Sequence, residues 1–404
     1  MLTGYGRDAQ PKKDRAAVWV LRDNIPATSS DTIAHMVDTY AGKLMPGQQV
    51  QTFRNTDVAF STRRIARGAD VRPLQYADLR LVDYPIPSGD KTYDLYDYVS
   101  RNRIGGLLVM HGGALVLEQY ELGLDPSTRW LSMSMAKSVS TTLVGLAIQD
   151  GFIESVDDLL TRYLPKLVGS AYDGVTIREL MQMTSGVHWD DTHTEPKSER
   201  RRMLELQIGQ QPGAIMDYMA ELPRSADPGS LWNYSTGETH VVGAIVHAAT
   251  GQWLSDYLSA RIWSRLGMES DATWWLEAPG GLEVAGSGIA ATLRDYGRFA
   301  AFLLADGVID GERVLPEGWV SEAGAPREVG GRQLNYGYMW WAVPGSDGSM
   351  ADGAFSARGI FGQFMYINPA RQVAIVVLSS RSKPKGAEAI IDNDFFNATL
   401  DALR

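Results

Sequence analysis

The sequence contains four places where a lysine follows a serine at the third position, a spacing that can pair a nucleophile with a base. The pairs are Ser88 with Lys91, Ser134 with Lys137, Ser380 with Lys383 and Ser382 with Lys385. A serine hydroxyl is a poor nucleophile at neutral pH and needs a neighbouring base, which a lysine becomes when burial lowers its pKa. The spacing alone selects none of the four pairs.

Only Ser134 is followed by a long helical pattern. No proline interrupts residues 134–150, apolar residues recur there at helical spacing on more than one face, and Gly151 supplies a left-handed stop. Residues three apart on a helix share a face, so the side chains of Ser134 and Lys137 can meet. The alternative is that Ser134 only caps the helix and that Lys137 extends into solvent.

The other pairs lie in poorer surroundings. Ser88 is in a turn between prolines and Gly89, where residues three apart need not face one another. Ser380 and Ser382 follow an apolar, strand-like run, and the lysines after them are expected in a solvated loop.

A second candidate group is Tyr234, between the turn Pro228–Ser230 and a helix expected to begin near Thr236. A tyrosine at such a junction can project its hydroxyl into a cleft. A neighbouring lysine ammonium should favour the phenolate, so that the hydroxyl could take or relay a proton. For a lone tyrosine, the ordinary alternative is a core residue with a local hydrogen bond.

The composition limits the kinds of protein that this chain can be. Its 404 residues are 44% hydrophobic and 21% charged, as in a folded chain with a substantial core. The net charge of −10 argues against nucleic acid or an anionic membrane as a partner. The basic run Glu199–Arg202 is expected to be a solvated helix face. Without cysteine, disulfides, thiolate catalysis and cysteine-ligated zinc are excluded, and no metal set is apparent among the six histidines.

The N-terminus and the hydropathy pattern bear on location. The first residues lack a basic-then-apolar leader with a small-residue cleavage site, and no run of about 18 apolar residues occurs. A cytoplasmic protein is therefore expected, or a periplasmic one if a leader has been removed.

Strand-like sequences near both ends of the chain enclose a helix-rich middle. Residues 107–117 predict one hairpin and residues 360–380 predict another. Helical patterns fill residues 134–266, and a last helix is expected within residues 386–404. This order is typical of an α+β fold, with an antiparallel sheet flanked by helices and an inserted all-helical domain.

Three units follow from this order. Residues 1–80 are expected to be an irregular N-terminal segment packing on the main domain. Residues 81–154 and 281–404 would form the α/β domain with the antiparallel sheet, and residues 155–280 the helical domain.

Two motifs together resemble a known superfamily. "SMAK" opens the predicted helix with Ser134, and "YST" contains Tyr234 roughly a hundred residues later. They resemble the serine β-lactamase and penicillin-binding superfamily, and the chain is similar to its class C β-lactamase-like group. Within that group it resembles the 6-aminohexanoate-dimer hydrolases (nylon-oligomer hydrolases) and the family VIII carboxylesterases. Longer stretches such as "VTIRELMQMTSGVHWDD" and "ARGIFGQFMYINP" extend the resemblance over about residues 100–385.

The resemblance implies a β-lactamase/transpeptidase-like fold and three catalytic residues. Ser134 would be the acylated nucleophile, Lys137 its base partner, and Tyr234 the tyrosine of the family's Tyr-x-Asn element. The third position of that element is Thr236 here, so the contacts of the family's asparagine do not carry over to it.

The family's Lys-Thr-Gly or His-x-Gly element is missing. The corresponding strand, Ala357–Gln363, contains neither lysine nor histidine. It must still supply a backbone N–H, so the N–H groups of Ser134 and Ile360 are assigned to the oxyanion hole. Arg358 either restores a cation for the substrate or points to solvent. Without Lys-Thr-Gly, efficient β-lactam turnover is not expected.

The loop between the two motifs lies where this family covers its cleft. Trp189 and His193 are candidates for lining the cleft, although a surface position is the favoured interpretation for His193. Asp190, Asp191 and Glu195 predict an acidic rim suited to a cationic or neutral substrate.

These observations predict a serine hydrolase that cleaves amide or ester bonds of small linear substrates through an acyl-enzyme, as 6-aminohexanoate-oligomer hydrolases do. A family VIII-type carboxylesterase or a weak β-lactamase is the enzymatic alternative. An acylatable binding or sensor protein of the same fold is the non-enzymatic one. No cofactor is expected. The expected partner is a small-molecule amide or ester, and a homodimer stays open.

Overall fold

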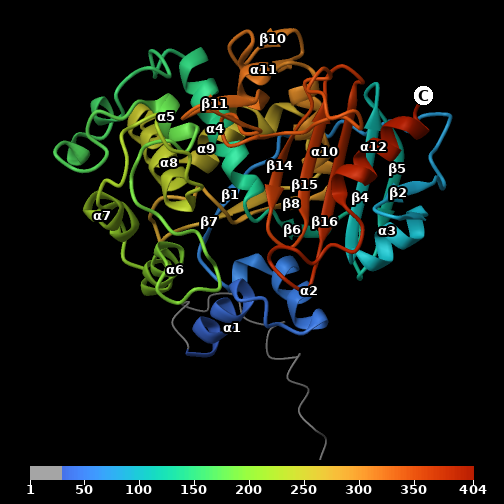
Figure 1. The fold of residues 1–404 in the computed structure, drawn as a ribbon, viewed down its shortest axis with the longest axis horizontal. Coiled ribbons are helices and arrows are strands. Elements are labelled where there is room, and N and C mark those ends of the chain that lie inside the picture. The colour runs from blue at the N-terminus through green and yellow to red at the C-terminus, as the bar shows by residue number, and fades with distance from the viewer. Residues whose placement is uncertain (1–29) are drawn as a thin grey trace, which may run out of the picture.

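The computed structural model describes residues 30–404 (Figure 1). Its strands are β1 (Thr62–Ile65), β2 (Ile86–Ser88), β3 (Lys91–Tyr93), β4 (Ile104–His111), β5 (Ala114–Tyr120), β6 (Arg129–Leu131), β7 (Ala272–Trp275), β8 (Ile289–Thr292), β9 (Val308–Ile309), β10 (Glu312–Arg313), β11 (Arg327–Val329), β12 (Arg332–Leu334), β13 (Trp341–Ala342), β14 (Phe355–Gly359), β15 (Gln363–Asn368) and β16 (Val373–Ser379). Its α-helices are α1 (Ser30–Tyr40), α2 (Pro46–Arg54), α3 (Leu95–Arg101), α4 (Met135–Gln149), α5 (Ile177–Met181), α6 (Glu199–Gly209), α7 (Ala214–Glu221), α8 (Thr236–Thr250), α9 (Leu254–Arg261), α10 (Leu293–Leu304), α11 (Trp319–Gly324) and α12 (Asp392–Ala402).

The larger sheet joins strands from residues 104–120 to strands from residues 341–379. Its strand order is β13-β14-β15-β16-β4-β5, and every neighbouring pair is antiparallel. The two hairpins predicted from the sequence are β4–β5 and β15–β16, and they join because β16 pairs with β4. The predicted α+β architecture, with one antiparallel sheet built from both ends, is confirmed.

Both faces of this sheet are covered by helices, which explains the unbroken apolar runs of its strands. Leu107 and Val109 of β4 pack into the cluster that contains Phe395 and Phe396 of α12. The alternate residue Leu108 faces the opposite cluster, which contains α10. Figure 1 shows α10 and α12 on the two sides of the sheet.

A second sheet departs from the predicted division of the chain. Its order is β1-β7-β8-β6. Strand β7 lies inside residues 155–280, which were predicted to be helical, and it pairs with β1 from the N-terminal segment. The prediction of an irregular segment over residues 1–80 is wrong for its described part, because α1, α2 and β1 lie there. Residues 1–29 of that segment lie outside the described residues.

Helix α4 runs through the centre of the molecule. Every residue from Met135 to Ala147 is buried, as the apolar groups on several faces of the helix predict. The turn of α4 around Gly145, near the C-terminal end of the helix, lies very close to α11. A Cβ at Gly145 would lie only 2.4 Å from the ring of Trp319, so only glycine permits this approach.

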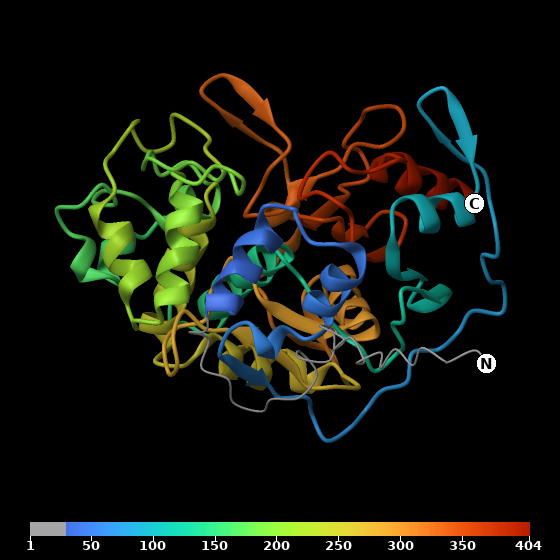
Figure 2. The same cartoon turned by 90° about the horizontal axis from the view of Figure 1, so that it is seen from below.

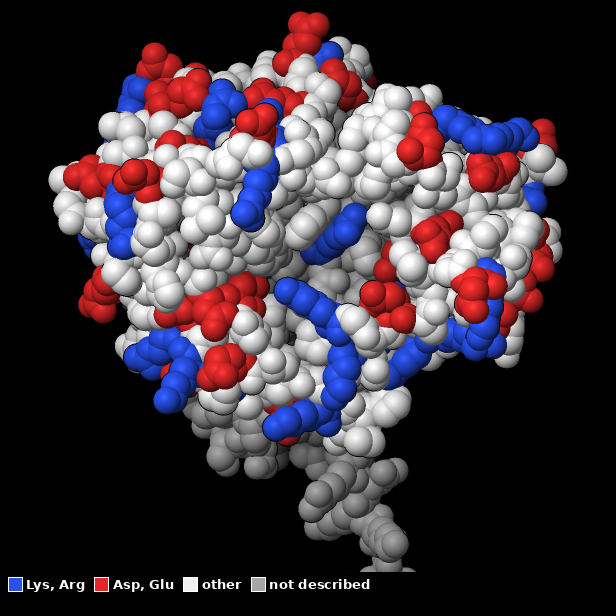
Figure 3. Space-filling model, viewed as in Figure 1, with Lys and Arg blue, Asp and Glu red and all other residues white. Residues whose placement is uncertain are grey.

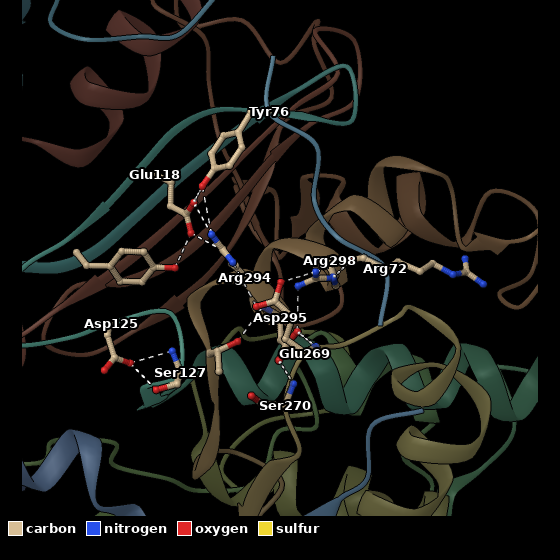
Figure 4. A network of polar contacts seen from close by, with 12 residues as sticks. Arg72, Tyr76, Glu118, Asp125, Ser127, Glu269, Ser270, Arg294, Asp295 and Arg298 are labelled. Carbon is tan, nitrogen blue, oxygen red and sulfur yellow. Dashed lines mark hydrogen bonds and ion pairs between the residues drawn. The ribbon is translucent and has the colours of Figure 1, made fainter. Parts of the chain in front are cut away.

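An ion-pair network fixes the extended chain between β1 and β2 to the body of the protein (Figure 4). Arg294 of α10 binds Glu118 of β5 at 2.6 Å, and Tyr76 donates to the same carboxylate. Arg298 donates at 2.6 Å to the carbonyl oxygen of Arg72. These contacts attach residues 72–76 to both a helix and a strand of the α/β part.

None of the helices in residues 30–404 has the length and apolar character needed to cross a membrane.

Candidate active site

Ser134 stands at the N-terminus of α4, directly after a strained turn. Its side chain makes no capping hydrogen bond, so the interpretation of Ser134 as a simple helix cap is wrong. The residue before it, Met133, has a φ of 47°, a left-handed conformation that costs energy for a residue with a side chain. The hydroxyl is therefore left available at the start of a buried helix.

Lys137 lies one helical turn further and is 1% exposed, so it does not extend into solvent. Its Nζ donates to three acceptors: Ser134 Oγ at 3.1 Å, Thr236 Oγ1 at 3.0 Å and the carbonyl oxygen of Gly286 at 3.0 Å. An ammonium group has three protons, and these three acceptors accommodate all of them. The side chain is held in one position.

Burial lowers the pKa of Lys137 to about 7. The carboxylate of Asp191 opposes this change, whereas the charges of Arg200 and Lys385 add to it. A lysine with this pKa is partly neutral near pH 7, and in its neutral form it can accept the proton of Ser134.

Two of the lysine's partners were missed by sequence reasoning. Thr236 occupies the position where the family has asparagine, and its hydroxyl still contacts the lysine. The place of Thr236 as the third residue of the Tyr-x-Asn element could have indicated its contact with the lysine. Gly286 takes part through its backbone, which gives no side-chain signal. A Cβ there would lie 3.3 Å from the lysine Nζ and 3.0 Å from a methyl group of Thr236.

Tyr234 lies within a group of aromatic rings beside the lysine. Its ring centroid is 5.3 Å from Lys137 Nζ and 6.0 Å from the ring of Trp341. Burial raises the pKa of Tyr234, the charge of Asp191 adds to this, and contact with Ser134 opposes it in part. The expected shift towards the phenolate is therefore wrong. A partly neutral lysine attracts the phenolate weakly, and burial of the hydroxyl prevails.

The end of strand β14 packs against the turn that carries Ser134. A Cβ at Gly359 would lie 2.6 Å from the carbonyl oxygen of Ser132 and 3.0 Å from Met133 Cβ. The predicted strand Ala357–Gln363 is wrong in extent, because β14 ends at Gly359 and β15 begins at Gln363. Ile360 follows β14 in the connecting turn and is 8% exposed.

Arg358 points into the site. Its Nε donates to Ser356 Oγ at 2.9 Å, and its guanidinium lies 5.4 Å from the ring centroid of Trp341. Burial lowers its pKa. Among the described residues it has no ion-pair partner within 4.0 Å, in contrast to Arg381, which binds Asp392. Of the two alternatives for Arg358, the solvent-facing one is wrong.

Two adjoining cavities meet at Tyr234, and Figure 3 shows a hollow with Lys and Arg side chains at its edges in the middle of this face. The first cavity, of ≈ 580 Å³, is lined by Ser134, Asp191, His193, Tyr234, Arg358, Ile360, Lys383 and Lys385 among others. The second cavity, of ≈ 790 Å³, is lined by Ala41, Trp189, Asp190, Asp191, His193, Tyr234, Lys383 and Lys385 among others. Lys383 and Lys385, from two of the three rejected pairs, are exposed, as expected, but they also form a wall of both cavities.

The loop predicted to form an acidic rim lies deeper than expected. Asp191 accepts hydrogen bonds from Trp189 Nε1 at 2.8 Å and from the Thr236 N–H at 3.0 Å. Its Oδ2 is buried and has no hydrogen-bond partner in residues 30–404. Burial opposes ionisation, but nearby positive charges, Lys137 among them, outweigh it and lower the pKa of Asp191. A rim position is therefore wrong for Asp191, whereas Glu195 is exposed.

His193 also differs from its favoured interpretation as a surface residue. It is 7% exposed and stacks on Tyr40 of α1, with the ring centroids 5.7 Å apart. Burial lowers its pKa to about 3, so the ring is neutral near pH 7. No group of three side chains in residues 30–404 is arranged to hold a metal ion.

Comparison with known proteins places this geometry in a family. The Beta-lactamase family profile matches residues 95–396. The 6-aminohexanoate-dimer hydrolase of Paenarthrobacter ureafaciens is 29% identical over 306 residues, which cover 72% of this chain and 76% of that protein. A Bacillus anthracis structure provisionally named 6-aminohexanoate-dimer hydrolase has a TM-score of 0.76 at 23% identity, covering 93% of this chain and 97% of that one. The hydrolase EstCE1, named with promiscuous acyltransferase activity, has a TM-score of 0.56 at 16% identity, covering 76% and 96%.

The two structural matches share too little sequence to show more than the fold, and that fold is the predicted β-lactamase/transpeptidase-like one. The family profile covers well over half of the chain and includes both Ser134 and Tyr234. The resemblance inferred from "SMAK" and "YST" is confirmed: the chain belongs to the Beta-lactamase family and is a serine hydrolase.

Proposed function

We propose that this hydrolase cleaves amide or ester bonds of small linear substrates by transient acylation of Ser134. One observation carries the proposal. A fully buried lysine, with its pKa lowered to about 7, lies 3.1 Å from the serine hydroxyl. A buried lysine is costly, and a protein that only bound ligands would have no use for one placed as a base.

The proton path follows from the two pKa shifts. Neutral Lys137 takes the proton as Ser134 Oγ forms a bond to the substrate carbonyl carbon. The bond to the leaving amine or alcohol then breaks, and that group receives a proton. Tyr234 stays protonated near pH 7 because burial raises its pKa, so it acts as a donor and relay in this step and not as the base. Water then attacks the acyl-enzyme by the same path and releases the acid.

Two backbone N–H groups would stabilise the oxyanion. We assign this role to Ser134 and Ile360, because the end of β14 packs against the nucleophile turn at Gly359. Donors fixed in the backbone need no reorganisation when charge develops on the oxygen, which is how such sites lower a barrier.

The cations of the first cavity bear on the substrate class. Arg358 and Lys385 line this cavity with no ion-pair partner within 4.0 Å in the described part of the chain. Arg358 is partly buried, and a partly buried charge without a partner is unfavourable unless a ligand supplies the counter-charge. Lys385 is exposed, so its attraction for a carboxylate is weaker and is screened by salt. We therefore propose that preferred substrates carry a carboxylate on this side, contrary to the preference expected from an acidic rim. A linear aminohexanoate oligomer, as the relative's name suggests, has such a group.

A substrate panel tests the proposal. Purified enzyme is treated with a fluorophosphonate and mapped by mass spectrometry, and then assayed with p-nitrophenyl esters, a 6-aminohexanoate dimer and nitrocefin. We expect a single adduct at Ser134, turnover of short esters and of at least some linear amides, and slow turnover of nitrocefin. An adduct at Ser88 would refute the nucleophile. One round of acylation without turnover would favour the binding or sensor alternative.

A further inference from the structure

The N-terminal segment contacts three separate parts of the chain around the cleft, although the family match begins only at residue 95. Residues 36–53, from the end of α1 through α2, are called the bridge here. Figure 2 shows them in blue, between the green helical lobe and the orange and red C-terminal part.

The bridge contacts the loop wall of the second cavity through Tyr40, which is 3% exposed. One stacking contact is to His193, with ring centroids 5.7 Å apart. The guanidinium of Arg200 lies 4.5 Å from the centroid of the Tyr40 ring. The Nε atom of Arg200 is buried and has no hydrogen-bond partner in residues 30–404. A cation–π contact of this kind contributes more stabilising energy when it is shielded from water. Arg200 was expected on a solvated face, but it is 4% exposed.

The bridge also contacts the opposite, lysine-bearing wall. The carbonyl oxygen of Gly42 accepts a 2.8 Å hydrogen bond from Lys383 Nζ. A Cβ at Gly42 would lie 2.8 Å from Pro384 Cδ, so the two backbones are in close contact. Gln49, 3% exposed, donates at 2.7 Å to the carbonyl oxygen of Arg381.

A third contact lies behind the part of the site formed by Ser134, Lys137 and the end of β14, called the catalytic corner here. Phe53 is fully buried, with its ring centroid 5.5 Å from Trp130 and 5.4 Å from Phe361. Trp130 belongs to β6, just before the nucleophile turn, and Phe361 follows Ile360. The bridge thus holds both walls and the base of the cleft, and its residue Ala41 lines the second cavity between the two walls.

We propose that the bridge is a specificity-determining part of the active site, and that Ala41 sets how long a linear chain the second cavity accepts. This inference rests on the proposed function. The two walls, residues 189–194 and 383–385, come from distant parts of the sequence, and the bridge contacts both. A larger side chain at position 41 would therefore shorten the cavity without touching Ser134 or Lys137.

The variant Ala41→Phe tests this directly. Two ester series are assayed: p-nitrophenyl esters with acyl chains of two to eight carbons, and acetate esters of alcohols over the same lengths. In one of the two series the ratio of kcat/KM for the longest to the shortest member should fall about tenfold or more, with the loss mainly in KM. Ala66→Phe is the matched control, because Ala66 is half-buried and lines neither cavity. Its ratio should equal that of the wild type.

A second variant separates this role from simple support of the fold. Tyr40→Leu keeps an apolar side chain but removes the ring between His193 and Arg200, so length selectivity should relax together with any loss in melting temperature. A lower melting temperature with unchanged length ratios, or equal ratios in Ala41→Phe and wild type, would overturn the inference. Failure of the proposed function looks different, since wild-type enzyme would then hydrolyse no ester in either series.

Discussion

The catalytic corner differs in its handling of positive charge from the wall of the first cavity that carries Arg358, Arg381, Lys383 and Lys385. In the corner, Lys137 is buried and its Nζ has three hydrogen-bond acceptors within 3.1 Å. On the wall, Arg381 is paired with Asp392 at 2.5 Å, but Arg358 and Lys385 have no acidic partner within 4.0 Å in residues 30–404. Lys137 in the corner therefore has all its hydrogen-bond partners without substrate, whereas Arg358 and Lys385 on the wall have no counter-charge.

This difference supports the proposal that the corner carries out the chemistry and that the wall selects among substrates. A side chain whose partners are all in place keeps its geometry through the reaction, as a preorganised base must. An unpaired, partly buried cation such as Arg358 raises the energy of the free enzyme, and an arriving carboxylate recovers that energy in binding. Mutations in the corner should therefore reduce kcat for every substrate, and mutations on the wall should change the preference between substrates.

The largest effect is expected at the nucleophile. Ser134→Ala should lower kcat by several orders of magnitude, about 10³-fold or more, because the covalent route is lost. The measurement is ester hydrolysis by protein whose far-UV circular dichroism matches that of wild type. Ser88→Ala is the control and should keep most activity, since Ser88 only accepts a backbone N–H from Ile391. An active Ser134→Ala variant would show that Ser134 is not the nucleophile.

Lys137→Ala should lose nearly as much as Ser134→Ala, because base and nucleophile act as a unit. Lys137→Arg should not restore activity, since a guanidinium stays protonated. In wild type, kcat/KM should rise with pH through about 7, because the lysine must lose its proton to act as a base and its pKa is lowered to about 7. A rate that falls over this range would exclude neutral lysine as the base.

Tyr234→Phe keeps the aromatic contacts and removes only the hydroxyl. It should lower kcat by about 10²-fold, with a smaller change in KM, because a donor to the leaving group is lost. Esters of good leaving groups such as p-nitrophenol need this proton less than amides do, so the loss should be greater for amides. Equal and small losses for both would make Tyr234 a packing residue.

On the wall, Arg358→Gln should alter selectivity. The pair to compare is mono-p-nitrophenyl glutarate and p-nitrophenyl valerate, which differ in a terminal carboxylate. The ratio of their kcat/KM values should exceed one in wild type and fall about tenfold in the variant, as expected for loss of a charge-assisted hydrogen bond. Preference for the neutral ester in wild type would contradict the proposed substrate class.

Lys385→Met should give the smallest effect, a few-fold fall in the same ratio. Lys385 is exposed, so salt should screen its charge over about 8 Å at physiological ionic strength. The effect should shrink further at 1 M salt, whereas that of the half-buried Arg358 should persist. Lys91→Met, in the β2–β3 hairpin, is a control at an exposed lysine that lines neither cavity.

The corner could be predicted from the sequence because local rules determine it. Three-residue spacing on an uninterrupted helix brings Ser134 and Lys137 together, and the two motifs indicated the family. The hairpins β4–β5 and β15–β16 were likewise predicted from local turn signals. The rest of the site depends on segments far apart in the sequence. Gly286 contributes only its carbonyl oxygen, and no pattern of residue types could have indicated it.

The errors about Asp191, His193 and Arg200 share one cause, which is that burial of charged groups is not a local property. Asp191, His193 and Arg200 lie in a polar stretch that is typical of a solvated loop or helix face. His193 and Arg200 are buried because Tyr40 of α1 packs against both of them. Asp191 is partly buried beside Trp189 and Thr236, from which it accepts hydrogen bonds. Similarly, the pKa of Tyr234 was expected to fall because the lysine was taken as fully charged. Burial lowers the pKa of Lys137 and raises the pKa of Tyr234, which reverses that expectation.

The long sequence separations within the bridge contacts have a consequence for synthesis of the protein. Gln49 and Arg381 are 332 positions apart, and Gly42 and Lys383 are 341 apart. At a translation rate of about 5–20 residues per second, the N-terminal helices wait on the ribosome for tens of seconds before these partners emerge. The cleft is completed only when almost the whole chain has been made. A nascent or C-terminally truncated hydrolase would already contain its serine and lysine but lack a closed cleft, so activity is a late and sensitive reporter of complete synthesis.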